Sequence, residues 1–518
     1  MKKIALLLKN SLINNQTYQI IEKLENDKDI ELIFLLLDQK DSSTLSEKFY
    51  SFVFKIEEKI VQKFSPQDSI KHDISKIFQN IQRDYFSTHK LENLQNSGID
   101  LVYSFINLDE VDNDLLKSIT KDGYIYTLYS DNRKIKSKNI AFWEIYNRED
   151  SIGFSIHHNN KVLFRGAINT QRTKTQTQIR LYKESSTYII KTLKEYANTG
   201  GLTILDEKII YTNPPLPSPT ILQTSNYLKK TLLLYSKLLI KRLIFKQHPR
   251  FGVAFIRSSW ENAQLDKGIE IKNPTNHFLA DPFVWTKDNR TICFVEDFDY
   301  TQHIAWISAI EIFEDNSYKM LGEVIREDFH LSFPYLFTYE DELYMVPEST
   351  QEGTVRLYKC INFPLKWKYQ YNLMENVKTA DTMIFPHDNR WWLFTNMSTE
   401  GNDDQAAQLF AFYSDSPLSK QWTPHDKNPL VFDSDCGRNG GILFDQDIPL
   451  RGRQKQAFNI YGAGLSIAKI TELSPSNYKE EKICDIKSTF FKNLKANHHI
   501  HSHQNITVYD YMRYEGLG

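Results

Sequence analysis

Apolar runs recur through the second half of the chain at a spacing of about fifty residues. Each run begins with two small or unusual residues and ends on an aromatic residue. The four runs are His277-Phe-Leu-Ala-Asp-Pro-Phe-Val-Trp285, Ser332-Phe-Pro-Tyr-Leu-Phe337, Ala380-Asp-Thr-Met-Ile-Phe385 and Asn439-Gly-Gly-Ile-Leu-Phe444. Short strands inside such a period are typical of a β-propeller, in which each repeat forms one blade.

A second apolar strand follows each run after a short polar turn. The fourteen-residue step from Pro282 to Glu296 is repeated from Thr382 to Asn396. Two strands joined by a tight turn bring the chain back to the same edge of a sheet. We therefore expect Asp281 to lie beside Glu296 at one end of its blade. The inner strands of a propeller line its centre, so polar groups at their starts should converge there.

The length of the repeat predicts five blades over residues 251–518. Four begin at the runs given above. The fifth is expected around Asn497–His503, closed by an earlier strand such as Gly252–Ile256.

The first third of the chain has a different pattern, in which apolar runs alternate with helical spacing. Strands are predicted at 4–8, 30–37, 99–105 and 123–128, a helix at 16–24, and mixed helix over the polar stretch 46–95. Strands separated by helices predict a doubly wound, parallel α/β sheet, and we assign this domain to residues 1–205. Because no G-x-G-x-x-G follows the first strand, a dinucleotide is not expected.

A connector over residues 206–250 joins the two regions. Asn213-Pro-Pro-Leu-Pro-Ser-Pro219 predicts a stiff linker, and residues 224–246 predict a basic amphipathic helix. There is no Asp or Glu from Lys208 to Trp260. Such a helix suits peripheral contact with an anionic membrane, and it equally suits an interdomain helix whose leucines pack on the propeller.

Composition excludes several classes of protein. The net charge of −2 gives no overall attraction to nucleic acid, and none is expected as a partner. The four cysteines are scattered, without the spacing of a zinc site, which favours a reducing compartment. The apolar run near the N-terminus is too short for a signal peptide, and no run has the length of a membrane span. We expect a cytoplasmic protein without a cofactor, and the membrane interpretation of the basic helix would place it peripherally at the inner membrane.

Two segments resemble the formyltransferase family, in the branch found beside bacterial sugar enzymes. They are Ala141-Phe-Trp-Glu-Ile-Tyr-Asn-Arg-Glu-Asp-Ser-Ile-Gly-Phe-Ser-Ile156 and Lys161-Val-Leu-Phe-Arg-Gly166. The resemblance implies that residues 1–200 have that fold. It also implies a catalytic His before the first segment and an Asp before the second. Tyr126–Arg133 contains no His, and His158 stands near the expected Asp. We therefore expect a domain that has lost formyl transfer, with His157-His158 as a polar hairpin end.

The propeller region resembles the N-terminal domain of glucosamine inositolphosphorylceramide transferases and their bacterial relatives. The matching motifs include His277–Phe283, Phe329–Pro334, Tyr344–Ser349, Val355–Tyr358, Trp391–Phe394 and Arg438–Gly441. More distantly, it is similar to the five-bladed glycosidases of the arabinanase and fructosidase type. Those enzymes place carboxylates at the starts of their first three blades; this chain has Asp281 and Asp381, but Phe333 in the second blade. Plant members of the transferase family carry a separate glycosyltransferase domain after this region, and this chain ends without one, so the family name alone does not imply their activity here.

Glycosyl chemistry needs one carboxyl group to move a proton and another near the anomeric carbon, where positive charge develops. Asp281, Glu348 and Asp381 are the candidate catalytic residues. Guanidinium groups bind phosphate bidentately, so a phosphate-linked leaving group would suit Arg residues. The candidate substrate-binding residues are Glu296, His330, Arg356, Trp391 and Arg438. The cluster His498, His499, His501 and His503 places its last three members on one strand face, and no metal is expected there.

These features predict a carbohydrate-active protein of bacterial surface polysaccharide synthesis (capsule or lipopolysaccharide). We expect glycosyl transfer from an activated sugar donor to a glycan or lipid-linked acceptor. Three alternatives stay open: a propeller-type glycoside hydrolase with Asp281 as base or nucleophile, a non-catalytic scaffold that binds a glycan or a partner, and a formyltransferase acting on a nucleotide-linked amino sugar.

Overall fold

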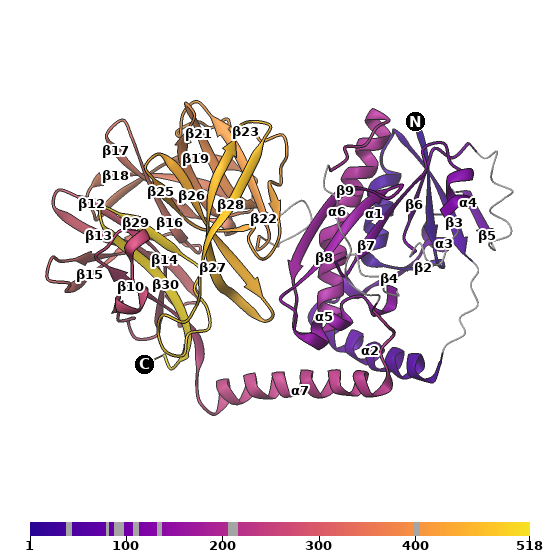
Figure 1. Ribbon diagram of the computed structural model, residues 1–518, viewed down its shortest axis with the longest axis horizontal. Helices are drawn as coiled ribbons and strands as arrows, with labels where there is room; N and C mark the ends of the chain where they lie inside the picture. Colours follow the sequence, from indigo (N-terminus) through magenta and orange to yellow (C-terminus); the bar gives the residue numbers. More distant parts are fainter. Residues whose placement is uncertain are drawn as a thin grey trace. The chain divides into compact units, whose positions relative to one another are not determined.

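A computed structural model describes residues 1–37, 44–78, 82–86, 98–106, 113–131, 137–205, 216–397 and 405–517. The chain forms two compact units (Figure 1). The first spans Met1–Leu234 and the second begins at Tyr235. The division lies within helix α7 (Ile221–Leu243), whereas residues 206–215 of the predicted linker lie outside the described residues.

The first unit is built on a seven-stranded sheet in the order β5-β3-β1-β6-β7-β8-β9. The first five strands in that order are parallel, and β8 and β9 are antiparallel additions. The strands are β1 (Lys2–Leu8), β3 (Ile30–Leu37), β5 (Gln82–Phe86), β6 (Leu101–Ser104), β7 (Tyr124–Tyr129), β8 (Ser151–His158) and β9 (Lys161–Asn169). The predicted α/β sheet with helices is confirmed; its membership of the formyltransferase fold stays a prediction.

Helices cover this sheet, because its strands are apolar on both faces. Leu116 of α4 (Asn113–Ser118) packs in one apolar cluster with Ala5 and Leu7 of β1. Ile4 and Leu6 are equally buried and point to the other face by strand alternation. The remaining helices are α1 (Asn15–Glu25), α2 (Leu45–Phe64), α3 (Ile74–Ile77), α5 (Phe142–Asn147) and α6 (Lys174–Thr199), and α6 packs on α1, β8 and β9.

The prediction of mixed helix over residues 46–95 is confirmed for α2 and for the short helix α3, but it is wrong for β4 (Lys71–Asp73) and β5. Helix α2 ends at Phe64, just before Ser65 and Pro66, and a residue before proline disfavours helical backbone. Beyond it lie β4, which pairs with β2 (Leu12–Asn14), and the edge strand β5. Residues 79–81 and 87–97 of this stretch lie outside the described residues.

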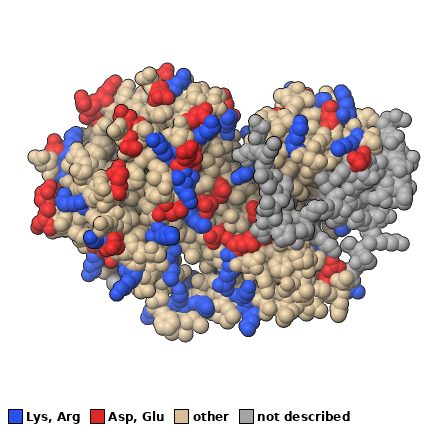
Figure 2. Space-filling model, in the orientation of Figure 1, with Lys and Arg blue, Asp and Glu red and all other residues tan. Residues whose placement is uncertain are grey.

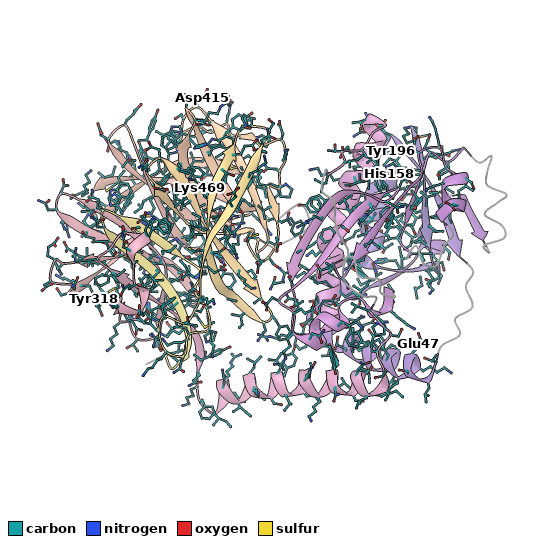
Figure 3. All side chains as sticks on the ribbon, in the orientation of Figure 1. Glu47, His158, Tyr196, Tyr318, Asp415 and Lys469 are labelled. Atoms are coloured by element: carbon teal, nitrogen blue, oxygen red, sulfur yellow. The ribbon has the colours of Figure 1, made fainter. Side chains whose placement is uncertain are left out.

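His157 and His158 stand at the end of the β8–β9 hairpin and point apart, as alternation predicts. The Nε2 atom of His158 lies 2.6 Å from the carbonyl oxygen of Asp122, whose carboxylate also accepts a hydrogen bond from Tyr196. Figure 3 labels His158 and Tyr196 in the first unit. His157 is buried, stacks on Tyr126 and lies 2.6 Å from the Ser155 hydroxyl. Burial lowers the pKa of His157 to about 4, so this imidazole is neutral.

The second unit contains five antiparallel sheets, which are the five predicted blades. The first four blades are β12 (His277–Lys287) to β15, β16 (Ser332–Tyr339) to β19, β20 (Thr379–His387) to β23 with β24, and β25 (Arg438–Asp445) to β28. Their other strands are β13 (Arg290–Asp299), β14 (Ile304–Ile312), β15 (Tyr318–Ile325), β17 (Glu342–Glu348), β18 (Thr354–Asn362), β19 (Lys366–Glu375), β21 (Arg390–Met397), β22 (Gln408–Ser414), β23 (Thr423–Pro424), β24 (Val431–Phe432), β26 (Ile448–Ala457), β27 (Ile460–Leu473) and β28 (Tyr478–Ile486).

The fifth blade joins segments from both ends of the unit, as expected. β29 (Ile500–His503) and β30 (Ile506–Glu515) form a hairpin, and β10 (His248–Ile256) and β11 (Ile269–Ile271) complete the sheet. Each inner strand contacts the next: β12 contacts β16, β16 contacts β20, β20 contacts β25 and β25 contacts β29. β29 in turn contacts β12. The five inner strands therefore form a closed ring.

A β-bulge interrupts the inner strand of each of the first four blades at the same place. Pairing between the first two strands shifts after Ala280, Ser332, Ala380 and Asn439. The bulge places Asp281, Phe333 and Asp381 in the left-handed region, at φ of 48°, 44° and 50°. A bulge re-aims the side chain that it carries. The residues that recur at the start of each apolar run in the sequence are therefore the residues of the bulge.

Gly441 shows why the fourth bulge needs glycine. Its φ is 103°, and a Cβ atom there would stand 2.2 Å from the carbonyl oxygen of Ile500 in the fifth blade. A side chain at this position would push the two blades apart.

Candidate active site at the centre of the propeller

The bulges bring charged side chains from different blades together at the starts of the inner strands. The group contains five carboxylates and three basic side chains: Asp281, Glu296, Glu348, Asp381, Asp510, His330, Arg438 and His498. It includes six of the eight residues predicted to catalyse or bind, and it adds Asp510 and His498 from the fifth blade. We call it the central cluster.

Arg438 links the second, third and fourth blades. Its Nε atom donates to Asp381 Oδ2 at 2.6 Å, and a terminal nitrogen lies 3.8 Å from Glu348 Oε2. The backbone N–H of Asp381 also donates to Glu348 Oε2, at 3.3 Å. Burial, followed by repulsion from Asp381, raises the pKa of Glu348 to about 7 although Arg438 opposes this. A carboxyl group with that pKa can give or take a proton near neutral pH.

His498 joins the last blade to the first. Its Nδ1 atom lies 2.6 Å from Asp510 Oδ2 and its Nε2 atom 3.4 Å from Asp281 Oδ1. Burial alone would lower the pKa of His498, but Asp510 and then Asp281 raise it to about 9, so the ring is protonated at neutral pH. Burial also raises the pKa of Asp281 well above its ordinary value, while His498 acts in the opposite direction.

Asp281, His498 and Asp510 are near enough to one another to share a metal ion. The charged imidazolium of His498 already supplies positive charge between the two carboxylates. The arrangement is explained without a metal ligand set, and no step of the chemistry below uses one.

Glu296 and His330 form a third pair, between the first and second blades. His330 Nε2 lies 3.2 Å from Glu296 Oε1, and His330 is partly exposed. Desolvation is the largest single effect and works against the charged ring, but the hydrogen bond that the ring donates to Glu296, together with the charges of Glu296 and Glu348, raises the pKa of His330. As expected, Glu296 lies next to Asp281 across the β12–β13 pair, opposite Ala280.

Half-buried aromatic rings connect these pairs along one rim. Phe251 lies 4.6 Å from His498 and 5.9 Å from Phe278, which stacks on Phe298 at 4.8 Å. Phe298 in turn lies 6.0 Å from His330. An aromatic face beside carboxylates is a suitable surface for a sugar ring, which has an apolar face and polar edges.

Tyr461 extends this aromatic rim and was missed in the sequence. It is 43% exposed, although the guanidinium of Arg438 lies over its ring at 5.1 Å and His498 is 5.4 Å away. Tyr461 is the second residue of β27, and only blade geometry places it beside residues of other blades. Alternation of aromatic residues near strand ends is the one sequence signal that could have suggested it.

The structure does not bring two of the predicted binding residues to the central cluster. Arg356 packs over Phe329 and lies near Glu352 and Glu327 at the rim of the second blade. Trp391 stands at the start of β21, opposite Pro386, and contacts Phe337 and Tyr339. It therefore lies at the end of the hairpin away from Asp381. A role of either residue in binding stays a prediction.

His499, His501 and His503 follow one strand face, as alternation predicts, and they line the contact between the fifth and first blades. The Nδ1 atoms of His501 and His503 accept hydrogen bonds from the backbone of Val284 and Thr286, each at 3.2 Å. Burial lowers the pKa of all three rings, that of His501 to about 3. His501 and His503 act as neutral acceptors between the fifth and first blades, whereas His499 packs against Phe283 and Phe333.

Buried polar contacts hold the loop that carries Arg438. Arg451 pairs with Glu480 through two hydrogen bonds of 2.9 and 2.7 Å and also donates to the carbonyl oxygen of Cys436. Asn396 donates to the carbonyl oxygen of Gly437 and accepts from the backbone of Asn439. Asn396 therefore joins the third blade to the fourth.

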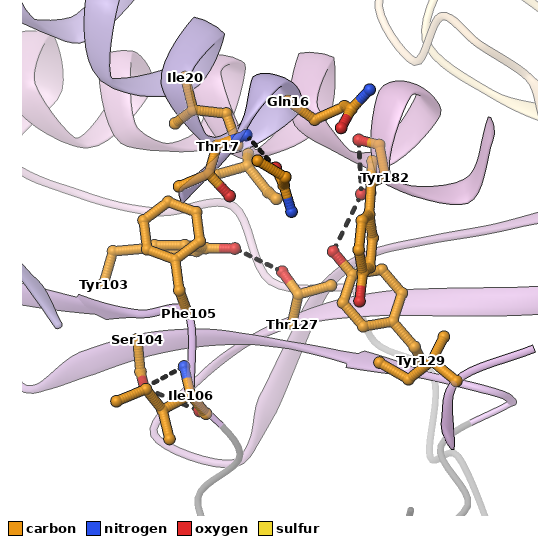
Figure 4. Close-up of a pocket in the computed structure, with 14 residues that line it drawn as sticks. Gln16, Thr17, Ile20, Tyr103, Ser104, Phe105, Ile106, Thr127, Tyr129 and Tyr182 are labelled. Carbon is orange, nitrogen blue, oxygen red and sulfur yellow. Dashed lines mark hydrogen bonds between the residues drawn. The ribbon is translucent and has the colours of Figure 1, made fainter. Parts of the chain in front are cut away.

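The first unit contains a separate small cavity of about 100 Å³ (Figure 4). Its wall includes the first turn of α1 and the ends of β6 and β7, next to β1, where the strand order reverses. Open α/β sheets bind ligands at this place. Hydroxyl groups dominate its polar lining; Tyr103 bonds Thr127 at 2.8 Å and Tyr129 bonds Ser185 at 3.1 Å. Among the described lining residues no side chain is charged.

Comparison with known proteins shows that the propeller is similar in sequence to part of a group of plant transferases. Residues 267–510 match the family model of the N-terminal region of glucosamine inositolphosphorylceramide transferase 1. The propeller is similar to part of a known transferase. The protein of that name from Arabidopsis thaliana is 34% identical over 213 residues, and that from Oryza sativa subsp. japonica is 32% identical over 210 residues. Each alignment covers 40% of this chain and 28% of the plant protein, so the match spans little more than a quarter of these relatives.

Solved structures with a related fold are much more distant. A family 117 glycoside hydrolase of Zobellia galactanivorans is 10% identical, with a TM-score of 0.35, over 51% of this chain and 90% of its own. The β-fructofuranosidase BmSUC1 of Bombyx mori is also 10% identical, with a TM-score of 0.34, over 54% and 61%. Likenesses this weak say nothing of this chain's activity. The predicted resemblance to the transferase family is confirmed, and that to formyltransferases stays a prediction.

Proposed function

We propose that the propeller transfers a glycosyl unit from an activated, phosphate-linked sugar donor to a glycan or lipid-linked acceptor. One observation carries the proposal: a buried cluster of carboxylates at the propeller centre, with Glu348 at a pKa of about 7, lies beside the partly exposed aromatic ring of Tyr461. The similarity of residues 267–510 to part of a named transferase supports transfer over hydrolysis.

The central cluster suggests a role for each of its members. Glu348 is the group that moves a proton to or from the reacting oxygen, because its pKa lies near neutrality. Asp281 and Asp381 face the centre and stabilise the positive charge that develops at the anomeric carbon. His330 and Arg438 carry the positive charge that a phosphate leaving group requires.

The wider setting proposed from the sequence is bacterial surface polysaccharide synthesis in the cytoplasm. The plant relatives are named for inositolphosphorylceramide, a lipid, which favours the lipid-linked acceptor over a free glycan. Both the setting and the acceptor are part of this proposal.

The test is an assay of the full chain with a panel of nucleoside diphosphate sugars, with and without inositolphosphoryl lipids. We expect acceptor-dependent release of the nucleotide and transfer of the labelled sugar, both lost in Glu348→Gln. The matched control is Glu342→Gln at the other end of β17, which should keep full activity. Release of free sugar without an acceptor would indicate a hydrolase. Saturable binding without turnover would indicate a scaffold, and either result would overturn the proposal.

A further inference from the structure

Helix α7 carries two apolar faces, and one of them is open to solvent. Thr224 and Tyr227 are buried, with the Tyr227 hydroxyl 2.6 Å from Glu57 Oε2. Leu232, Leu239 and Leu243 lie on the other side of the helix and are 66%, 57% and 64% exposed. Residues spaced by seven and eleven positions share one face of a helix. The expectation that the leucines of this helix pack on the propeller therefore does not hold for this face.

The open face forms a broad stripe. It contains Leu222, Leu232, Leu233, Leu239, Ile240 and Leu243, all exposed. Ile244 and Phe245 continue the apolar surface beyond the last turn. A soluble domain seldom exposes this much contiguous apolar side chain unless it serves as a binding surface.

Basic side chains border the stripe, and acidic ones are absent from its sequence neighbourhood. Lys237, Arg242 and Lys246 are exposed, and the sequence from Ile209 to Trp260 has no Asp or Glu. Lys and Arg side chains stand among uncharged ones on the surface where α7 lies (Figure 2). Two other lysines are engaged, since Lys230 donates to the carbonyl oxygen of Tyr146 and Lys241 lies over the ring of Tyr514.

We propose that the open face of α7 docks on an anionic phospholipid surface, with its leucines in the acyl boundary and its basic residues at the headgroups. The charge pattern selects this occupant, because apolar surface with a basic border complements an anionic bilayer. The helix lies on the surface rather than crossing it; among the described helices none has the length and apolarity of a membrane span. The proposal does not depend on the reaction assigned to the propeller.

The test is flotation of the full chain with vesicles of phosphatidylcholine alone and of phosphatidylcholine with phosphatidylglycerol. We expect binding to the anionic vesicles only, weakened by high salt, because the charges involved are exposed. Lys237→Glu/Arg242→Glu should weaken binding at least about tenfold, since each basic residue near the surface contributes about 1 kcal/mol. Leu232→Ser/Leu239→Ser should weaken it comparably.

The matched control is Ile361→Ser/Ile483→Ser, which removes two similarly exposed apolar side chains from the blades. It should bind as wild type does, and circular dichroism should be unchanged in all variants. Binding to neither vesicle, or binding that the α7 substitutions do not alter, would overturn the proposal. So would a dimer in the absence of lipid that Leu232→Ser/Leu239→Ser dissociates, because that result assigns the face to a second copy of the chain.

Discussion

The Nε2 atom of His498 lies 3.4 Å from Asp281 Oδ1, and its Nδ1 atom lies 2.6 Å from Asp510 Oδ2. His498 and Asp510 belong to the blade that closes the ring, and Asp281 belongs to the first blade. The same contact therefore closes the propeller and sets the charge at its centre. Stability and chemistry should respond together when it is changed.

Replacing His498 by Gln should destabilise the propeller by about 3–5 kcal/mol, the usual cost of breaking a buried ion pair. The substitution leaves Asp281 and Asp510 buried without their counter-charge. Urea unfolding followed by tryptophan fluorescence reports on the propeller, because only Trp143 of the eight tryptophans lies outside it. His387→Gln, at the last residue of β20, should change stability by less than about 0.5 kcal/mol. Equal effects of the two substitutions would contradict this account.

The contacts of His498 with Asp281 and Asp510 also predict how the stability of the propeller falls at alkaline pH. The folded-state pKa of His498, about 9, is above the ordinary value of 6.5. Its contribution is therefore complete below about pH 6.5 and is lost as the pH rises through 9. The difference in unfolding free energy between wild type and His498→Gln should shrink over that window, and a constant difference would be inconsistent with it.

His501 predicts the opposite dependence at acid pH. Burial holds its folded-state pKa at about 3, below the ordinary value of 6.5, so its contribution is complete above pH 6.5 and is lost as the pH falls toward 3. In His501→Asn, whose amide oxygen can still accept from Val284, the slope of stability against pH should be smaller by one proton, about 1.4 kcal/mol per pH unit. His303→Asn, at an exposed turn, is the matched control and should leave the slope unchanged.

Arg438 predicts a shift in the pH profile of activity. It lowers the pKa of Glu348, which is about 7 in the intact protein. Arg438→Gln should therefore move the limb of the kcat/KM profile near pH 7 to higher pH, by about one unit or more. Arg390→Gln, an exposed arginine over Tyr413, should leave the profile in place. A lower kcat/KM with an unmoved limb would show that Glu348 is not the titrating group.

Much of the fold could be predicted because the propeller repeats its apolar pattern at a constant period. The fifth blade was predicted from the same period, because residues 251–518 hold about five repeats of fifty residues. Helix α6 was missed for a physical reason: half of its buried face is polar, with Thr177, Glu184 and Ser185 fully buried, so its apolar periodicity is weak. The strands in the 46–95 stretch are short and lie at the sheet edge, where polar residues are tolerated.

Only some residues of the central cluster and its aromatic rim could be predicted from the sequence. Asp281 and Asp381 stood out because the repeat marks the bulges, and Glu296 followed from hairpin spacing. Tyr461 and Asp510 did not, because their approach depends on the twist and closure of blades rather than on local pattern. Trp391 was assigned to the site on motif alone, but its end of the hairpin faces away from Asp381.

The first unit should not transfer formyl groups. The segment 126–133 offers no His as proton acceptor, and residues 132–133 of it lie outside the described residues. The full chain incubated with a formyl-folate and nucleotide-linked amino sugars should yield no formylated product by mass spectrometry. A product above the enzyme-free control would restore the formyltransferase alternative.

The most direct measurement of the central claim compares Asp281→Asn with Asp288→Asn in the glycosyl-transfer assay. Both residues are in the first blade and both have positive φ, but Asp281 is buried at the centre whereas Asp288 is exposed in the β12–β13 turn. We predict a loss of kcat of at least about a hundredfold in Asp281→Asn, as expected for a carboxylate that acts on the reacting atoms, with unchanged circular dichroism and full activity in Asp288→Asn. Equal activity in the two folded variants would contradict a catalytic centre at the propeller axis.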